Sequence, residues 1–205
     1  MKLPITNEVR ELADSYAKKF ISANKSLKNF GNRSVMRSSN KQYSDACAGR
    51  IGELMFSEML GKYGYSLIFD EEIRKGGNSG DGCKDIEGFE FYGAKFGLKK
   101  KIDIKSTVGN WLLVEDHRFE ADAYVLLKVT DTDVTYRGYC FEKDFFKNPA
   151  EPKYEYRSGD RLRNAFDTSK LLSVRLDAPL QYGLPSSELR VGGFVDYLKS
   201  NAEPI

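Results

Sequence analysis

The residues best suited to chemistry lie between Ile102 and Lys105, where isoleucines alternate with charged side chains. Alternation with a period of two predicts a half-buried strand, here over residues 99–106. Asp103 and Lys105 then lie side by side on its second face. A carboxylate can hold a divalent cation, and a neighbouring ammonium can offset negative charge that develops during hydrolysis. The plain alternative is an exposed strand with a surface ion pair.

Three further acidic residues that precede this strand are candidates for the same site. Asp81 and Asp85 form a pair bracketed by glycine that runs into another short predicted strand. Asp85 stands at the entrance of that strand, whereas the glycines on both sides of Asp81 suit a turn. Farther upstream, Glu53 lies in a predicted helix over residues 45–62. A single helical glutamate is usually a solvated side chain, and only the downstream acids favour a role for it in a site.

This ordered set resembles the PD-(D/E)xK nuclease superfamily, which has the restriction-endonuclease-like fold. In that family a helix supplies one acid, a strand start supplies a second, and the next strand supplies the acid-x-Lys pair. The corresponding positions here are Glu53, Asp85, Asp103 and Lys105, with Asp81 as the alternative second acid. The resemblance covers roughly residues 45–130 and lacks the family's proline before the second acid. It implies an α/β fold with a mixed central β-sheet flanked by helices.

The resemblance also implies an activity, namely a Mg²⁺-dependent endonuclease that hydrolyses phosphodiester bonds in DNA as a homodimer. Mg²⁺, for which Mn²⁺ would substitute, prefers oxygen ligands. Glu53, Asp85, Asp103 and the main-chain carbonyl of Ile104 would provide them, and Lys105 would orient the attacking water. Restriction enzymes, phage or mobile-element nucleases, Holliday junction resolvases and repair nucleases all stay open. The rival interpretations are a non-catalytic nucleic-acid-binding protein of the same fold and a structural protein stabilised by a metal.

A basic segment over residues 24–43 precedes the helix that carries Glu53. It contains five basic residues and no acid, and Arg33, Arg37 and Lys41 are its candidates for contact with phosphates. Interleaved aromatic side chains would allow stacking on bases. The alternative is a solvated loop whose charges share a sign by chance. The formal net charge of +2 means that any affinity for nucleic acid must come from such local patches.

The 205 residues predict a single domain, with a catalytic core over about 45–130. Three widely spaced cysteines indicate neither a zinc site nor a disulfide framework, so we expect a reducing, cytoplasmic location. No apolar run has the length of a membrane span, and we expect no membrane partner. His117 is the single histidine, which argues against mechanisms that need several histidines.

Hydrophobic periodicity places the remaining elements. A helix over residues 5–27 is capped by Thr6 or Asn7. The continuous apolar run over 124–129 predicts a central strand. Further strands are predicted over 65–69, 111–114, 134–140 and 171–176, and short helices over 141–147 and 194–198.

Overall fold

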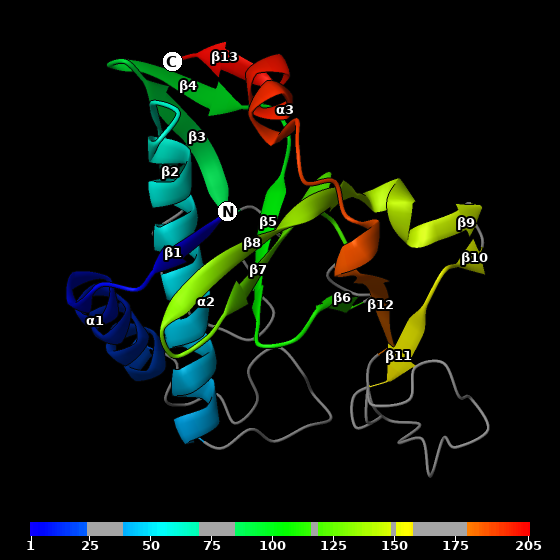
Figure 1. Cartoon of the computed structure of the whole chain (residues 1–205), viewed down its shortest axis with the longest axis horizontal. Helices are drawn as coiled ribbons and strands as arrows, with labels where there is room; N and C mark the ends of the chain where they lie inside the picture. Colours follow the sequence, from blue (N-terminus) through cyan, green and yellow to red (C-terminus); the bar gives the residue numbers. More distant parts are fainter. Residues whose placement is uncertain (24–38, 70–84, 116–118, 149–150, 158–179) are drawn as a thin grey trace.

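The chain has an α/β fold (Figure 1). The computed structural model describes residues 1–23, 39–69, 85–115, 119–148, 151–157 and 180–205. The helices are α1 (Asn7–Ala23), α2 (Ser39–Gly61) and α3 (Phe194–Ser200), and two 3₁₀ turns are η2 (Glu142–Phe145) and η5 (Ser186–Glu188). The strands are β1 (Lys2–Pro4), β2 (Tyr65–Phe69), β3 (Ile86–Phe91), β4 (Ala94–Leu98), β5 (Ile102–Thr107), β6 (Trp111–Glu115), β7 (Ala123–Val129), β8 (Asp133–Phe141), β9 (Phe146–Asn148), β10 (Glu151–Pro152), β11 (Glu155–Arg157), β12 (Leu180–Pro185) and β13 (Ala202–Pro204).

A mixed four-stranded sheet of order β1-β8-β7-β5 lies at the centre. β5 and β7 run parallel, with Asp103 opposite Tyr124, whereas the other neighbours are antiparallel. Side chains alternate between the faces of β7, so Val125 joins one hydrophobic cluster while Tyr124 and Leu126 join another. The strand is buried on both faces, which confirms the central strand that its apolar run predicts.

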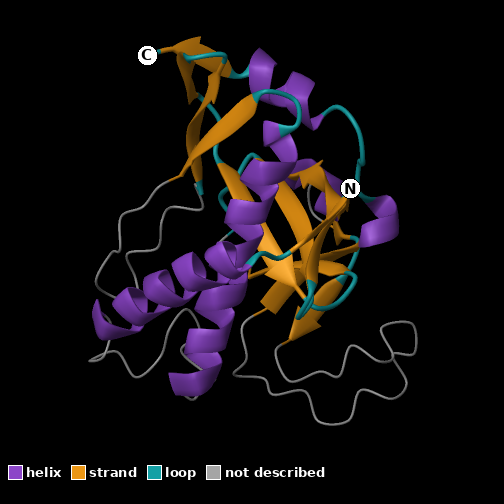
Figure 2. Ribbon diagram, turned by 60° about the vertical axis from the view of Figure 1, so that its left-hand side comes forward, coloured by secondary structure: helices purple, strands orange, loops and turns teal. Residues whose placement is uncertain are grey.

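Different layers cover the two faces of this central sheet. On one face α2 contributes Met55, Phe56 and Met59 to the larger cluster, and α1 packs against α2 (Figure 2). On the other face, Leu112 and Leu184 come from the three-stranded sheet β11-β12-β6. The expected helical cover is therefore found on one face of the described structure, and a second sheet covers the other face.

An outer sheet of order β13-β4-β3-β2 adjoins α2. β2, β3 and β4 form an antiparallel meander, and β13 pairs with the far edge of β4. Aromatic side chains line this sheet: the rings of Tyr65 and Phe91 stack with centroids 4.5 Å apart. The segment Lys99–Lys101 then carries the chain from β4 into β5, so the outer and central sheets are joined directly before the candidate site.

The start of one helix agrees with the sequence prediction, and the start of another does not. Thr6 caps α1 as predicted, because its Oγ1 accepts the Val9 N–H at 3.3 Å. The predicted start of the second helix at residue 45 was wrong, since α2 begins at Ser39. Lys41 is therefore helical and lies 2.7 Å from Asp45 one turn ahead. This pairing at i,i+4 stabilises helical structure where the basic composition suggested a loop.

The predicted helix over 141–147 is also wrong, because only η2 forms there before β9 begins. Asp144 explains the short turn: its carboxylate accepts the Phe141 N–H at 2.8 Å and pairs with Arg190. Burial alone would raise the pKa of Asp144, but these bonds outweigh it and hold the pKa below the ordinary 3.8. The predicted strand over 171–176 lies outside the described residues.

Candidate active site

The predicted acid-x-Lys pair lies on β5 as its alternation requires. Asp103 is 2% exposed, and its Oδ2 is 2.6 Å from the Lys105 Nζ. The Asp103 side chain is buried, whereas that of Lys105 retains 31% of its exposure. Asp103 Oδ2 thus has an electrostatic partner, although it has no hydrogen-bond partner among the described residues. A carboxylate of this kind differs from the exposed surface pair that was the plain alternative.

Asp85 lies beside Asp103, at the edge of β5 that faces away from β7. The Asp85 N–H donates to the Ile102 carbonyl at 2.9 Å, and its Oδ2 accepts the Ile104 N–H at 2.5 Å. Its carboxylate thus occupies a position that a neighbouring strand's carbonyl would normally fill. Because the N–H and C=O of a strand residue point to the same edge, the Ile104 carbonyl also faces this side. The structure therefore brings Asp85, Asp103 and the Ile104 carbonyl to one stretch of β5.

Glu53 reaches β5 from a different direction. A Cβ on Gly52 would lie 2.0 Å from the Ser106 Oγ, so α2 packs directly against β5 at this glycine. Ser106 shares its strand face with Ile104, whereas Asp103 and Lys105 alternate onto the opposite face. Glu53 follows Gly52 on the helix and pairs with Arg50 at 2.8 Å. Glu53 therefore lies on the face of the central sheet that α2 covers. Its side chain would have to pass around the edge of β5 to reach Asp103, which lies on the opposite face.

Arg50 is a residue of this region to which the sequence analysis assigned no role. Its guanidinium lies 5.2 Å from the Tyr16 ring centroid and 5.6 Å from that of Phe69, and its side chain is 11% exposed. Two rings and the carboxylate of Glu53 thus hold the guanidinium in place. The Arg-x-x-Glu spacing at i,i+3 on a predicted helix was the signal that could have identified this pair.

The oxygen donors along β5 suit a hard divalent cation. The Asp103 Oδ2 is buried and faces the Lys105 ammonium at 2.6 Å, and carboxylate oxygens are ligands that Mg²⁺ prefers. Asp85, Asp103 and the Ile104 carbonyl are the groups that would hold Mg²⁺. Among the residues that the structure describes, no three His, Cys, Asp or Glu side chains are grouped so as to hold a metal ion. The participation of Glu53 stays a prediction.

Three of the predicted residues lie outside the described ranges: Asp81, Arg33 and Arg37. Lys41, the remaining candidate for phosphate contact, is exposed on α2, and Asp45 already partners its ammonium.

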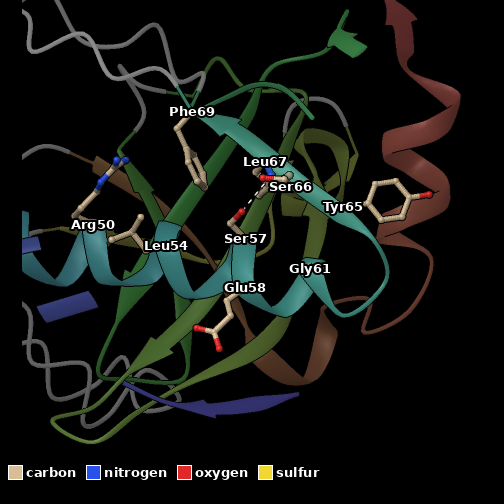
Figure 3. Close-up of a pocket in the computed structure, with 9 residues that line it drawn as sticks. All are labelled: Arg50, Leu54, Ser57, Glu58, Gly61, Tyr65, Ser66, Leu67 and Phe69. Carbon is tan, nitrogen blue, oxygen red and sulfur yellow. Dashed lines mark hydrogen bonds between the residues drawn. The ribbon is translucent and has the colours of Figure 1, made fainter. Parts of the chain in front are cut away.

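A cavity of about 470 Å³ opens between α2 and β2 (Figure 3). Arg50 and Phe69 lie at one end, and in the middle Ser57 Oγ accepts the Leu67 N–H at 3.1 Å. Its other lining residues are Leu54, Glu58, Gly61, Tyr65 and Ser66. None of Glu53, Asp85, Asp103 and Lys105 lines it, but Arg50, the partner of Glu53, does.

Comparison of the chain with protein-family models, with curated proteins and with solved structures finds no match. None of the described helices combines the length and apolar character needed to cross a membrane. The geometry of β5 and its neighbours is therefore the basis for assigning a function.

Proposed function

We propose that this chain is a Mg²⁺-dependent endonuclease that hydrolyses phosphodiester bonds in DNA, with a restriction-endonuclease-like arrangement of its acids. The observation that carries the proposal is the buried Asp103 carboxylate, 2.6 Å from Lys105 and beside the Asp85 carboxylate that binds the Ile104 N–H. Burying a charge costs several kcal/mol unless other groups compensate, so a protein rarely keeps one on a strand for stability alone.

Each residue of this group has a distinct task. A bound Mg²⁺ would screen the phosphate and make a bound water more acidic. Asp85 and Asp103 would hold the cation, and the bond from the Ile104 N–H fixes the orientation of the Asp85 carboxylate. Lys105 would orient the attacking water and offset the charge that develops on the phosphate oxygens. Its partial exposure leaves the ammonium open to a substrate.

The expected partner is DNA, bound by a homodimer, with Mn²⁺ able to replace Mg²⁺. Arg33, Arg37 and Lys41 are the proposed phosphate contacts. The restriction, phage or mobile-element, junction-resolving and repair activities would differ in their products, so a cleavage pattern distinguishes among them.

One observation favours a second function, a non-catalytic nucleic-acid-binding protein of similar fold. Glu53 lies on the α2 face while Asp103 lies on the other, and the described acids form no group of three. A binding protein that descends from a nuclease would tolerate such an incomplete site, and it would bind DNA with or without metal.

Incubation of supercoiled plasmid with the protein in a Mg²⁺ titration tests the proposal. We expect nicked and linear products that require metal, that also form with Mn²⁺, and that disappear with EDTA. The Asp103→Asn variant is the matched control, because it keeps the size of the side chain and removes the charge. Metal-independent DNA binding without cleavage in either metal would overturn the nuclease and support the binding protein.

A further inference from the structure

The turn between β3 and β4 holds a large aromatic residue in an unfavourable conformation. Tyr92 has φ +48° and is 85% exposed, and Gly93 follows with φ +84°. Two-residue hairpin turns with positive φ at both positions usually begin with Asn or Asp, because bulky side chains clash in this region. Backbone strain of this kind is concentrated at functional sites, so the exposed Tyr92 ring suggests a role beyond forming the turn.

The Tyr92 ring packs against the Phe91 ring and against the backbone at Gly64. The Phe91 ring meets it edge-on with centroids 4.5 Å apart, and Phe91 in turn stacks on Tyr65. On the other side, a Cβ on Gly64 would lie 3.3 Å from the Tyr92 Cζ, so the ring lies against the chain directly after Tyr63. Tyr63 is itself 57% exposed. The exposed Tyr63 and Tyr92 therefore both lie just beyond the end of α2.

Two exposed lysines lie near this part of the surface, and the ammonium of Lys199 lies over the Tyr65 and Phe91 rings. Lys199 of α3 is exposed, and its Nζ lies 5.8 Å from the Phe91 ring centroid, while the exposed Lys62 directly precedes Tyr63. The acids on α2, β3 and α3 are Asp45, Glu53, Glu58, Glu87, Glu90 and Asp196. Glu90 is half-buried and stands opposite Lys95 across the strands, so it faces a lysine of its own.

We propose that Tyr63 and Tyr92, with Lys62 and Lys199 beside them, form a stacking platform for unpaired bases of a DNA strand. Aromatic rings bind the π-face of any base, and neighbouring lysines contact the phosphates. The choice of DNA rests on the proposed function, and the position of the platform agrees with it. β3 begins directly after Asp85 and ends at this turn, a distance of roughly 20 Å at 3.3 Å per residue, or about six base steps.

The Tyr92→Asn variant removes the aromatic ring and should keep the fold. Asn suits a left-handed turn position, so the variant should fold at least as stably as the wild type while it lacks the ring. We expect a fluorescein-labelled oligothymidylate of about 12 nucleotides to bind about 5- to 150-fold more weakly, as measured by anisotropy in EDTA. Tyr92→Phe keeps the stacking surface and should bind as the wild type does. A fully paired duplex should bind both variants equally.

Unchanged oligothymidylate binding by Tyr92→Asn would overturn the platform. Conversion of a dimer to a monomer by Tyr92→Asn in sedimentation would also overturn it, because the rings would then form a contact between two copies of the chain. Since binding is measured without metal, the result does not depend on cleavage. Tyr92-dependent binding by a protein that cleaves nothing would keep the platform and reject the nuclease.

Discussion

Replacement of Lys105 by Met removes the ammonium that lies 2.6 Å from the Asp103 carboxylate and keeps most of the side chain's length. The Asp103 side chain is 3% exposed, so it would remain as a buried charge without its partner. Removal of one partner of a buried pair usually costs about 3–5 kcal/mol. Water reaches the Lys105 side, which is 31% exposed, so we expect a smaller loss of about 2–3 kcal/mol in the free energy of unfolding.

The same change should lower the cleavage rate without weakening the binding of metal or DNA. Because the carboxylates remain, Lys105→Met should bind metal and DNA nearly as well as the wild type. It should cleave roughly 10²–10³-fold more slowly, the usual effect of removing one group that stabilises the transition state electrostatically. Single-turnover cleavage of supercoiled DNA with Mg²⁺ measures the rate, and a DNA-binding titration with Ca²⁺ measures the affinity.

Two controls sharpen the measurement of stability by urea unfolding. Lys147→Met removes the surface pair between Lys147 and Glu151, whose side chains are 58% and 53% exposed, and should leave the free energy of unfolding almost unchanged. The double variant Asp103→Asn/Lys105→Met leaves no uncompensated charge and should be more stable than Lys105→Met alone. If Lys105→Met matched the wild type in both stability and cleavage rate, the pair would be an ordinary surface contact and the catalytic role would be refuted.

Asp85→Ala should abolish cleavage of plasmid in a metal-supplemented assay, whereas Asp81→Ala should only weaken it; the reverse ranking would reject Asp85 as the second acid. Gly52→Ala should lower the free energy of unfolding by about 1–2 kcal/mol because the new methyl group meets the Ser106 Oγ. This loss should disappear in a Ser106→Ala background, and urea unfolding that shows equal losses in both backgrounds would contradict the contact. Since the pKa of Asp144 lies below 3.8 in the folded state, its contribution to stability is complete above pH 3.8 and is lost as pH falls through the folded-state pKa. Thermal unfolding of Asp144→Asn should therefore depend less on pH in this acidic range, and parallel curves for variant and wild type would disprove the assignment.

The sequence predicts best the elements whose signal is local. Alternation identifies β5, the continuous apolar run identifies β7, and Thr6 identifies the start of α1. β1 and β13 have three residues each, and they form because distant strands offer them unpaired edges. No local pattern marks such strands, since the energy that fixes them comes from pairing with residues far along the chain.

The candidate site likewise combines features that a local sequence pattern predicts with features that depend on contacts between distant segments. The spacing of Asp103 and Lys105 by two residues is enough to place them on one strand face, and the structure pairs them. The bond between Asp85 and the Ile104 N–H depends on how two sheets meet, and no sequence pattern encodes it. The face from which Glu53 approaches depends on how α2 docks at Gly52, which is a matter of packing between distant segments.

The position of Asp85 between two sheets has a mechanical consequence. Its N–H and carboxylate are bound to β5 of the central sheet, while the next residue begins β3 of the outer sheet. Asp85 is therefore a direct link between the two sheets. A displacement of the outer sheet relative to the central sheet would pull on the Asp85 carboxylate and so on its bond to the Ile104 N–H. Hydrogen exchange at that single amide would register the motion.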